Sequence, residues 1–518
     1  MNRAVDEGRR RALILRIQRE RQQGKGRPII STVQGETRFV AVGNKLAYGH
    51  WRVFADFLVP HLSQTLGAEW GNAEIAKPPE DRHPIVRWYQ AFAQLQQEHH
   101  KPGEISAMPL LGAARAYLWL AYDIYTLEHN SASMPKREIW ERLLDRLRHP
   151  DQFVGARYEL RVAAIFVRAG FKLDWEDETD NTGTHGEFTA TFPATGRQFW
   201  VECKMRQPDP AKDPAENVGK FRSLVVKALR KKTDMERIVF VELNMPVDGQ
   251  PDRDNPGWRD WAVGCLRVLE GSPEGKALPP ALVLITNYPE HHHLDTLVPD
   301  LGAVLDGFNM EDHRLGVPLP LREAIERRER EPEINALFAS MTEHTEIPTT
   351  FDAEIPELLG VQARLRIGER FEVEPGKMGT LVEACLMEKE HQAACVLQHD
   401  DGTQAIYQLP LTVQEVTAWL RYPETFLGVL RQPSKQVSSP LELYDWFFAS
   451  MTETPKETLV ERLGGGEQLA GWSQIALAKE LAIRLTEGHI QHNNPFATPK
   501  WAERLRPPGI AKRNDDDT

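Results

Sequence analysis

The sequence has few cysteines and no long apolar run. Only four of its 518 residues are cysteine, and no two of them form a Cys-x-x-Cys pair. This excludes a disulfide-dense scaffold and gives no support to a zinc ribbon. No stretch reaches the roughly 18 consecutive apolar residues of a membrane-spanning helix, and the basic N-terminus lacks the apolar segment of a signal peptide. We therefore expect a protein of the reducing cytoplasm that has no membrane partner.

Two nucleotide-binding motifs are also missing. There is no Gly-x-x-x-x-Gly-Lys-Ser/Thr loop, so the chain itself is not expected to hydrolyse ATP. No Gly-x-Gly-x-x-Gly motif follows a predicted strand, and a dinucleotide cofactor is therefore not indicated. Positive charge is in deficit, with 63 Lys and Arg against 75 Asp and Glu and a formal net charge of −12. Contact with nucleic acid would have to come from local basic patches.

The rest of the composition is that of an ordinary globular protein. Hydrophobic residues make up 41% and charged residues 27%. At roughly 100–200 residues per domain, the length predicts about three domains. Changes of pattern along the chain predict a mainly helical domain with a basic arm (1–149), an α/β domain (150–315), a helical connector (316–350), a small antiparallel β domain (351–432), a helical region (433–505) and a disordered tail (506–518).

The segments on either side of the α/β domain have distinct patterns. Residues 1–30 hold nine Lys or Arg against three Asp or Glu, which is typical of a phosphate-contacting arm or of a solvated, partly helical terminus. Residues from about 45 to 150 predict amphipathic helices, with a buried helix over 110–127. Residues 321–345 predict one charge-rich helix. Short strands and tight turns over about 355–430 predict a small antiparallel barrel.

Helices and strands alternate between residues 150 and 290. The predicted order is helix 153–169, strands 171–175, 187–192 and 198–204, helix 218–232, strand 237–243, helix 258–269 and strand 281–286. This order of α-β-β-β-α-β-α-β predicts an α/β fold in which helices cover a sheet.

One group of residues in this segment indicates chemistry. Glu202-Cys203-Lys204 ends an apolar strand, and strand alternation directs Glu202 and Lys204 to the same face. Glu187 begins the preceding strand, and Glu159 lies on the helix before both strands. The carboxylates of Glu187 and Glu202, with the backbone carbonyl of Cys203, can supply oxygen ligands to Mg²⁺. Near the metal, the pKa of Lys204 would fall, and the lysine would activate water or stabilise charge at phosphorus.

This arrangement resembles the PD-(D/E)xK nuclease superfamily, which includes restriction endonucleases and archaeal Holliday-junction resolvases. The resemblance covers about residues 150–290 and implies a restriction-endonuclease-like core that cuts phosphodiester bonds with Mg²⁺ or Mn²⁺. It implies that Glu187 and Glu202 are metal ligands and that Lys204 is the catalytic lysine. Glu159 would be a helix acid that supports or extends the metal site.

The implied partner is nucleic acid, with DNA favoured, in restriction, anti-phage defence or repair. RNA is an alternative, because the chemistry acts on phosphates. A homo-oligomer, or a partner protein that supplies ATPase or targeting function, is left open. The rival hypothesis is a catalytically inactive nuclease-fold scaffold or a nucleic-acid-binding subunit. The acidic balance favours it, as does Glu187, because the family usually has the shorter aspartate there, often after proline.

Several residues have simpler interpretations. Glu202 and Lys204 could form surface ion pairs, and Glu159 could be an ion-pair partner on the helix surface. The basic side chains of helix 218–232 attract phosphates or form a solvated face, and the Pro-rich loop 207–217 is a candidate lid. Two further candidates are set aside: we expect His291-His292-His293 to be a loop at a strand end rather than a metal site, and Cys203 to be a buried, inert thiol.

Overall fold

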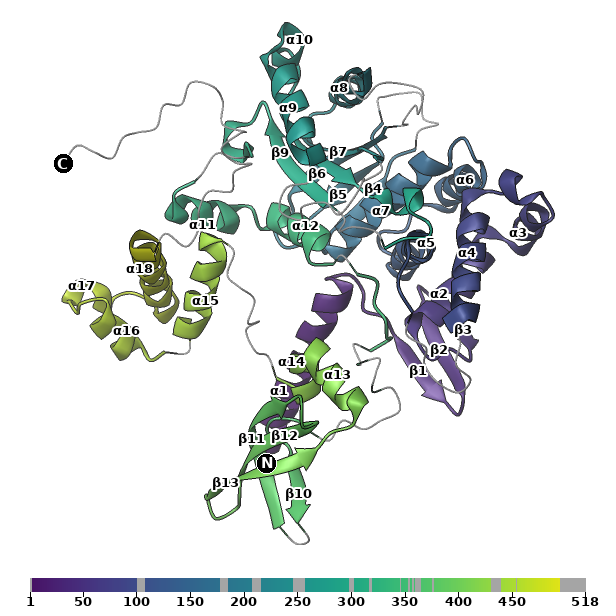
Figure 1. Ribbon diagram of the computed structural model, residues 1–518. Coiled ribbons are helices and arrows are strands. Elements are labelled where there is room, and N and C mark those ends of the chain that lie inside the picture. Colours follow the sequence, from purple (N-terminus) through teal and green to yellow (C-terminus); the bar gives the residue numbers. More distant parts are fainter. Residues whose placement is uncertain are drawn as a thin grey trace. The chain divides into compact units, whose positions relative to one another are not determined.

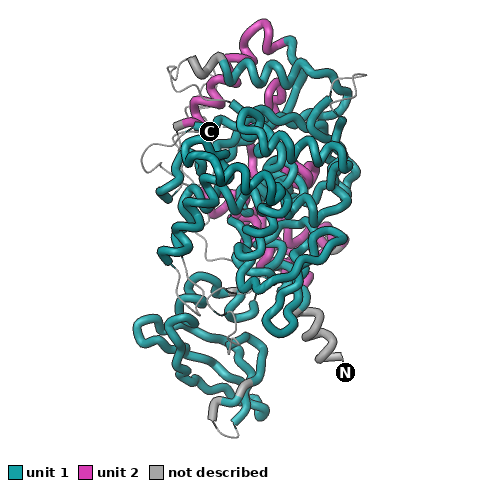
Figure 2. Tube along the Cα trace, turned by 90° about the vertical axis from the view of Figure 1, so that its right-hand side faces the viewer, with its two compact units in different colours: residues 1–251, 277–305, 336–431 teal, residues 252–276, 306–335, 432–518 magenta. Residues whose placement is uncertain are grey.

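A computed structural model gives the fold (Figure 1). It describes residues 2–99, 108–177, 185–206, 216–245, 257–297, 302–315, 319–344, 346–352, 355, 358, 365–374, 377–429, 439–452 and 454–493. The predictions for most of the Pro-rich loop and for the tail 506–518 lie outside these residues. The chain divides into two compact units, residues 1–251, 277–305 and 336–431, and residues 252–276, 306–335 and 432–518 (Figure 2).

The chain begins with helix α1 (Asn2–Gln23), which is followed by a small antiparallel sheet of β1 (Ser31–Gln34), β2 (Thr37–Val42) and β3 (Lys45–Gly49). The prediction that the helical region begins near residue 45 is therefore wrong. Gly35 and Gly43 have φ values of +63° and +59°, which glycine adopts readily, and they form the two turns that let these strands pair. Tyr48 pairs with Phe39 across β2 and β3 instead of starting a helix.

Helices follow as predicted: α2 (Phe54–Leu66), α3 (Ala68–Ile75), a short 3₁₀ helix (Pro79–Asp81), α4 (Pro84–His99), α5 (Gly112–His129) and α6 (Arg137–Arg148). The prediction of a buried helix is confirmed, because α5 is buried along almost its whole length and packs on α2, α4 and α7. At its first residue a Cβ atom on Gly112 would lie 2.0 Å from the carbonyl oxygen of His293. Only glycine permits this close approach of two chain segments.

The mixed sheet follows the predicted element order through the strand expected at 281–286, and α10 (Pro273–Lys276) and β9 (Gly302–Phe308) were not predicted. After α7 (Phe153–Arg168) come β4 (Lys172–Trp175), β5 (Phe188–Thr191), β6 (Gln198–Met205), α8 (Glu216–Leu229), β7 (Glu236–Glu242), α9 (Gly257–Gly271), α10, β8 (Ala281–Asn287), 3₁₀ helix η2 (Pro289–His292) and β9. The strand order is β4-β5-β6-β7-β8-β9. β4, β5 and β6 pair antiparallel, whereas β6, β7 and β8 pair parallel. Both α7 and α8 pack on β6.

The predicted barrel is wrong for the described strands, which form an open sheet. β10 (Arg370–Glu374), β11 (Lys377–Met387), β12 (Gln392–Gln398) and β13 (Gln404–Pro410) pair antiparallel in sequence order, so β10 and β13 are its edges. Helices α13 (Val413–Arg421) and α14 (Pro423–Leu427) follow. Thr412 and Glu415 form a capping box that begins α13. Trp419 and Phe426 from the two helices complete the buried core of this sheet.

The other unit contains α9 and α10 together with α11 (Leu321–Arg330), α15 (Pro440–Thr452), α16 (Lys456–Arg462), α17 (Glu467–Ala470), α18 (Gln474–Asn493) and the 3₁₀ helix η3 (Glu311–His313). The predicted single helix over 321–345 is two helices, because α12 (Pro332–Thr342) starts at a proline that disfavours helical backbone at Glu331. Ion pairs join α11 to α18 and α15, Arg322–Glu480 at 2.8 Å and Arg328–Asp445 at 2.7 Å. No helix among the described residues has the length and apolar character needed to cross a bilayer.

Candidate functional site

Two antiparallel strands bring predicted site residues together. The N–H of Glu187 donates to the carbonyl oxygen of Val201 at 2.9 Å, and Phe188 pairs with Val201 in the sheet. Glu187 therefore lies against β6 at the level of Val201, one residue before Glu202. A Cβ atom on Gly186 would lie 2.6 Å from the Trp200 ring, so a larger residue would push the chain away from β6. Gly186 thus sets the approach of Glu187 to the end of β6.

Glu176, just after β4, holds the segment that precedes β5. Its carboxylate accepts a hydrogen bond from the N–H of Gly186 at 2.7 Å and one from the Thr189 hydroxyl at 3.4 Å. The Nδ1 atom of His185 is 3.8 Å from the same carboxylate. These contacts fix the backbone around Glu187. Glu176 has no spacing relation to the Glu-x-Lys motif, so the sequence alone does not indicate it.

Glu202 is the centre of the site. Its side chain is fully buried, and two lysines neutralise it. Lys204 donates to Oε1 of Glu202. The ammonium of Lys231 lies 2.7 Å from Oε1 and 2.9 Å from Oε2, and it also donates to the carbonyl oxygen of His185 at 2.8 Å. The hypothesis that Glu202 and Lys204 are only surface ion pairs is therefore wrong, because the carboxylate has no exposed surface.

Lys204 links the two predicted ligands electrostatically. Burial acts to lower its pKa, but the charge and hydrogen bond of Glu202 and the charge of Glu187 outweigh burial and raise the pKa above its usual value. Both carboxylates therefore act on the same ammonium group. These neighbours raise the pKa of Lys204, whereas we expected a nearby metal ion to lower it.

Cys203 points to the other face of the sheet. Its thiol acts electrostatically on Tyr158 of α7, whereas Glu202 contacts Lys231, which follows α8. Burial, followed by the charges of Glu187, Glu159 and Glu202, raises the pKa of the Cys203 thiol well above its ordinary value. The prediction of a buried thiol is confirmed, and its inertness stays a prediction that the raised pKa favours. Metal ligation by its backbone carbonyl stays a prediction.

Glu159 is bound elsewhere. Its carboxylate forms a two-pronged ion pair with Arg146 of α6, at 2.7 and 2.5 Å, and its side chain is only 10% exposed. Arg157 and Arg161, which flank it on α7, pair instead with Glu290 and Asp123. The structure therefore joins Glu159 to α6, while Glu187, Glu202 and Lys204 form the group described above. A supporting role for Glu159 stays a prediction.

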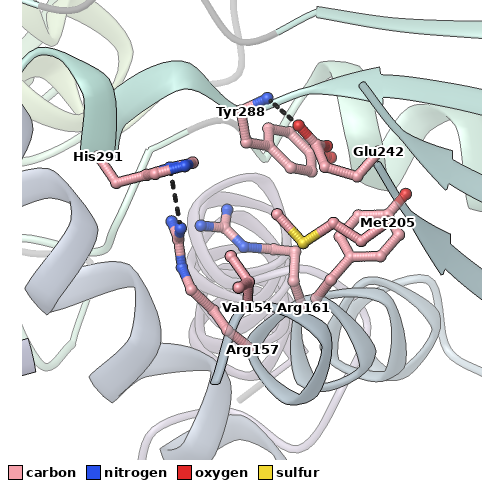
Figure 3. Close-up of a pocket in the computed structure, with 8 residues that line it drawn as sticks. Val154, Arg157, Arg161, Met205, Glu242, Tyr288 and His291 are labelled. Atoms are coloured by element: carbon pink, nitrogen blue, oxygen red, sulfur yellow. Dashed lines mark hydrogen bonds between the residues drawn. The ribbon is translucent and has the colours of Figure 1, made fainter. Parts of the chain in front are cut away.

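A second buried charge cluster lies on the α7 face of the same sheet (Figure 3). Glu242, at the end of β7, pairs in register with Met205 and lies beside Tyr288. Its carboxylate accepts hydrogen bonds from the Thr286 hydroxyl at 2.5 Å and from the N–H groups of Tyr288 and Asn244 at 2.9 and 3.0 Å. Burial raises the pKa of Glu242 to about 7. The adjoining cavity of about 10 Å³ has room for one water molecule.

Arginines of α7 complete this cluster. Arg157 donates to the fully buried Glu290 and to Nδ1 of His291. Arg161 bonds Asp123 at 2.8 Å and lies 3.4 Å from Glu290. The sequence did not indicate this network, in which Arg157 and its bonded partner His291 are 134 positions apart. The alternation of charge along α7 was visible, but nothing local indicated the partners.

The histidine run has a structural role in this network. His291 and His292 lie in the 3₁₀ helix η2 after β8, and Nε2 of each bonds Oδ1 of Asn244, at 2.6 and 2.8 Å. Burial and the neighbouring Arg157 lower the pKa of His291 to about 2. The run follows the end of β8 as expected, but its first two histidines lie in a 3₁₀ helix rather than in a loop. His291 is neutral and shared between Arg157 and Asn244.

The metal ligands that the site near Glu202 can offer include two carboxylate side chains, those of Glu187 and Glu202. Among the described residues, no three His, Cys, Asp or Glu side chains are grouped to hold a metal ion. Mg²⁺ is commonly held by one or two carboxylates, with water and substrate phosphate completing its shell. Glu187 and Glu202 fit that pattern in type, and the charges of both act on Lys204. Both oxygens of Glu202, however, already accept hydrogen bonds from lysines.

No match to a known protein was found. Comparison of the chain with protein-family models, with curated proteins and with solved structures gives no match.

Proposed function

We propose that the chain is a metal-dependent nuclease of the PD-(D/E)xK type that hydrolyses phosphodiester bonds, with DNA as the favoured substrate. The observation that carries the proposal is the hydrogen bond from Lys204 to the fully buried Glu202, beside the segment that bonds Glu187 to β6. Their strands lie within an α-β-β-β-α-β order with antiparallel β5–β6 and parallel β6–β7 pairing. Both are features that a restriction-endonuclease-like core requires, and they support this finer fold assignment.

The residues have distinct roles in this proposal. Glu187 and Glu202 would hold Mg²⁺ or Mn²⁺, with the carbonyl of Cys203 as a third oxygen. The bound ion would supply Lewis-acid stabilisation of the scissile phosphate. Lys204, which is 21% exposed, orients the attacking water and offers positive charge to the phosphate as negative charge develops. Glu202 holds the ammonium of Lys204 in place by accepting its hydrogen bond.

A second candidate function is a nuclease-fold scaffold or nucleic-acid-binding subunit without catalysis. Lys231 favours it, because this lysine already occupies both oxygens of the carboxylate that a metal would need. The partly exposed Lys204 at the same carboxylate favours the enzyme.

A cleavage assay tests the proposal. Wild type, Lys204→Met and Lys172→Met would be incubated with supercoiled plasmid, linear duplex, single-stranded DNA and RNA, each with Mg²⁺, Mn²⁺ or EDTA. Lys172→Met is the matched control, because it removes one exposed lysine from β4 of the same sheet. We expect metal-dependent cutting by wild type and control. In Lys204→Met, the cutting rate should fall by at least about 100-fold.

The outcomes separate the hypotheses. Cutting that survives in Lys204→Met would show that another site or a contaminant is responsible. Absence of cutting on every substrate with both metals would favour the scaffold. The preferred substrate would decide between DNA and RNA.

A further inference from the structure

Lys231 is the residue at Glu202 to which the proposed chemistry assigns no role. It lies in the turn between α8 and β7, 29 positions after the carboxylate that it binds. Its ammonium is within 2.7 and 2.9 Å of the two carboxylate oxygens. Lys231 therefore lies across both oxygens, whereas Lys204 donates to Oε1.

A divalent cation bound by Glu202 would need much of the same space. Mg²⁺ binds carboxylate oxygens at about 2.1 Å, closer than the ammonium of Lys231 lies. An ammonium on the same two oxygens would then be in contact with the ion. Because Glu202 is fully buried, the repulsion between these like charges would be screened weakly.

The ammonium group of Lys231 can move away from Glu202 into solvent. Its side chain is 28% exposed and stands on a flexible four-carbon stem. The backbone of Lys231 lies outside the regular helix, so the ammonium can move to solvent without unwinding α8. The fully buried Glu202 on the central strand β6 cannot follow it.

We propose that Lys231 is a positioning residue that excludes the divalent cation: it holds Glu202 by its charge, and it and the cation occupy that carboxylate alternately. This inference rests on the proposed nuclease function and refines its metal site. It follows that removal of the lysine charge strengthens cation binding, although it removes a hydrogen-bond donor from the site.

Titration with Mn²⁺ tests the inference without an activity measurement. Electron paramagnetic resonance would follow free Mn²⁺ with full-length wild type, Lys231→Met, Lys231→Arg, Glu202→Gln and Lys172→Met, and circular dichroism would check each fold. We expect Lys231→Met to bind Mn²⁺ at least about tenfold more tightly than wild type, because the competing positive charge is gone. Lys231→Arg and Lys172→Met should bind like wild type, and Glu202→Gln should abolish this binding.

The two ways of failing are distinguishable. If wild type binds Mn²⁺ through Glu202 and a folded Lys231→Met binds no more tightly, the role of Lys231 is overturned and the nuclease proposal stands. If neither wild type nor Lys231→Met shows binding that Glu202→Gln removes, the metal site itself is wrong and both proposals fall. Should Lys231→Met not fold, Lys231→Gln keeps a donor without the charge and must meet the same expectation.

Discussion

Two buried glutamates on neighbouring strands show how differently one fold can treat the same side chain. Glu202 on β6 and Glu242 on β7 are both inaccessible to solvent or nearly so. Glu202 is held by two lysines whose side chains are 21% and 28% exposed. Glu242 is held by a hydroxyl and two backbone N–H groups, and burial raises its pKa to about 7. The first carboxylate can therefore exchange its cations, whereas the second is suited to hold a proton within a closed network.

The largest expected effect is the loss of Arg157 from the closed network. In Arg157→Met, Arg161 at 3.4 Å is the one ion-pair partner that the described residues leave to the fully buried Glu290, and none of them bonds its Oε2. An unpaired buried charge typically costs about 3–5 kcal/mol. We expect a loss of about 3 kcal/mol in the free energy of unfolding, measured by urea denaturation. A loss below about 1 kcal/mol would show that Glu290 is paired or hydrated in another way.

Glu242 should make stability depend on pH. Its folded-state pKa of about 7 lies above the ordinary value of 4.5, so the folded protein retains a proton that the unfolded chain releases. The stabilisation is complete below about pH 4.5 and is lost as the pH rises through 7, a change of about 3 kcal/mol. Urea denaturation of wild type and Glu242→Gln from pH 4.5 to 8.5 should give curves that diverge in this direction. Parallel curves would contradict the raised pKa.

Gly186→Ala tests how closely β5 must approach β6. The new Cβ would lie 2.6 Å from the fully buried Trp200, so we expect a loss of about 1–3 kcal/mol in unfolding free energy. The shift of Glu187 should also weaken Mn²⁺ binding. Gly264→Ala in α9 is a matched control, because its Cβ meets nothing within 4 Å and alanine favours helix. Equal stability of the two variants would mean that Trp200 moves aside freely.

The smallest expected effect is that of Lys231→Met on stability. The variant leaves Lys204 on Glu202, and the lost ammonium was partly exposed, so screening by solvent limits the change. We expect less than about 1 kcal/mol in urea denaturation at pH 7. If Lys231→Met lost as much unfolding free energy as Arg157→Met, the partly exposed lysine at Glu202 would stabilise the fold as strongly as the buried arginine at Glu290. The contrast between the two sites would then not hold.

Much of the central sheet was predictable because its signals are local. Apolar runs bounded by turn residues gave the positions of β6, β7 and β8, and the break at Gly170 ended α7 as expected. The small N-terminal sheet was missed, although Gly35 and Gly43 mark its turns, because the aromatic spacing from Tyr48 onward also matches a helix. The barrel was over-predicted, since strand spacing does not determine whether the edges of a sheet meet.

The sequence by itself determined which residues of β6 lie on the same face of the strand. The two-residue period of β6 places Glu202 with Lys204, and it separates both from Cys203. Only the tertiary structure decided their partners: Lys231 for Glu202, Arg146 for Glu159, and the Glu242 network around Arg157. The reason is physical. Backbone periodicity acts over a few residues, whereas strand register and helix packing bring together charges that are far apart in the chain, and burial then strengthens their interaction.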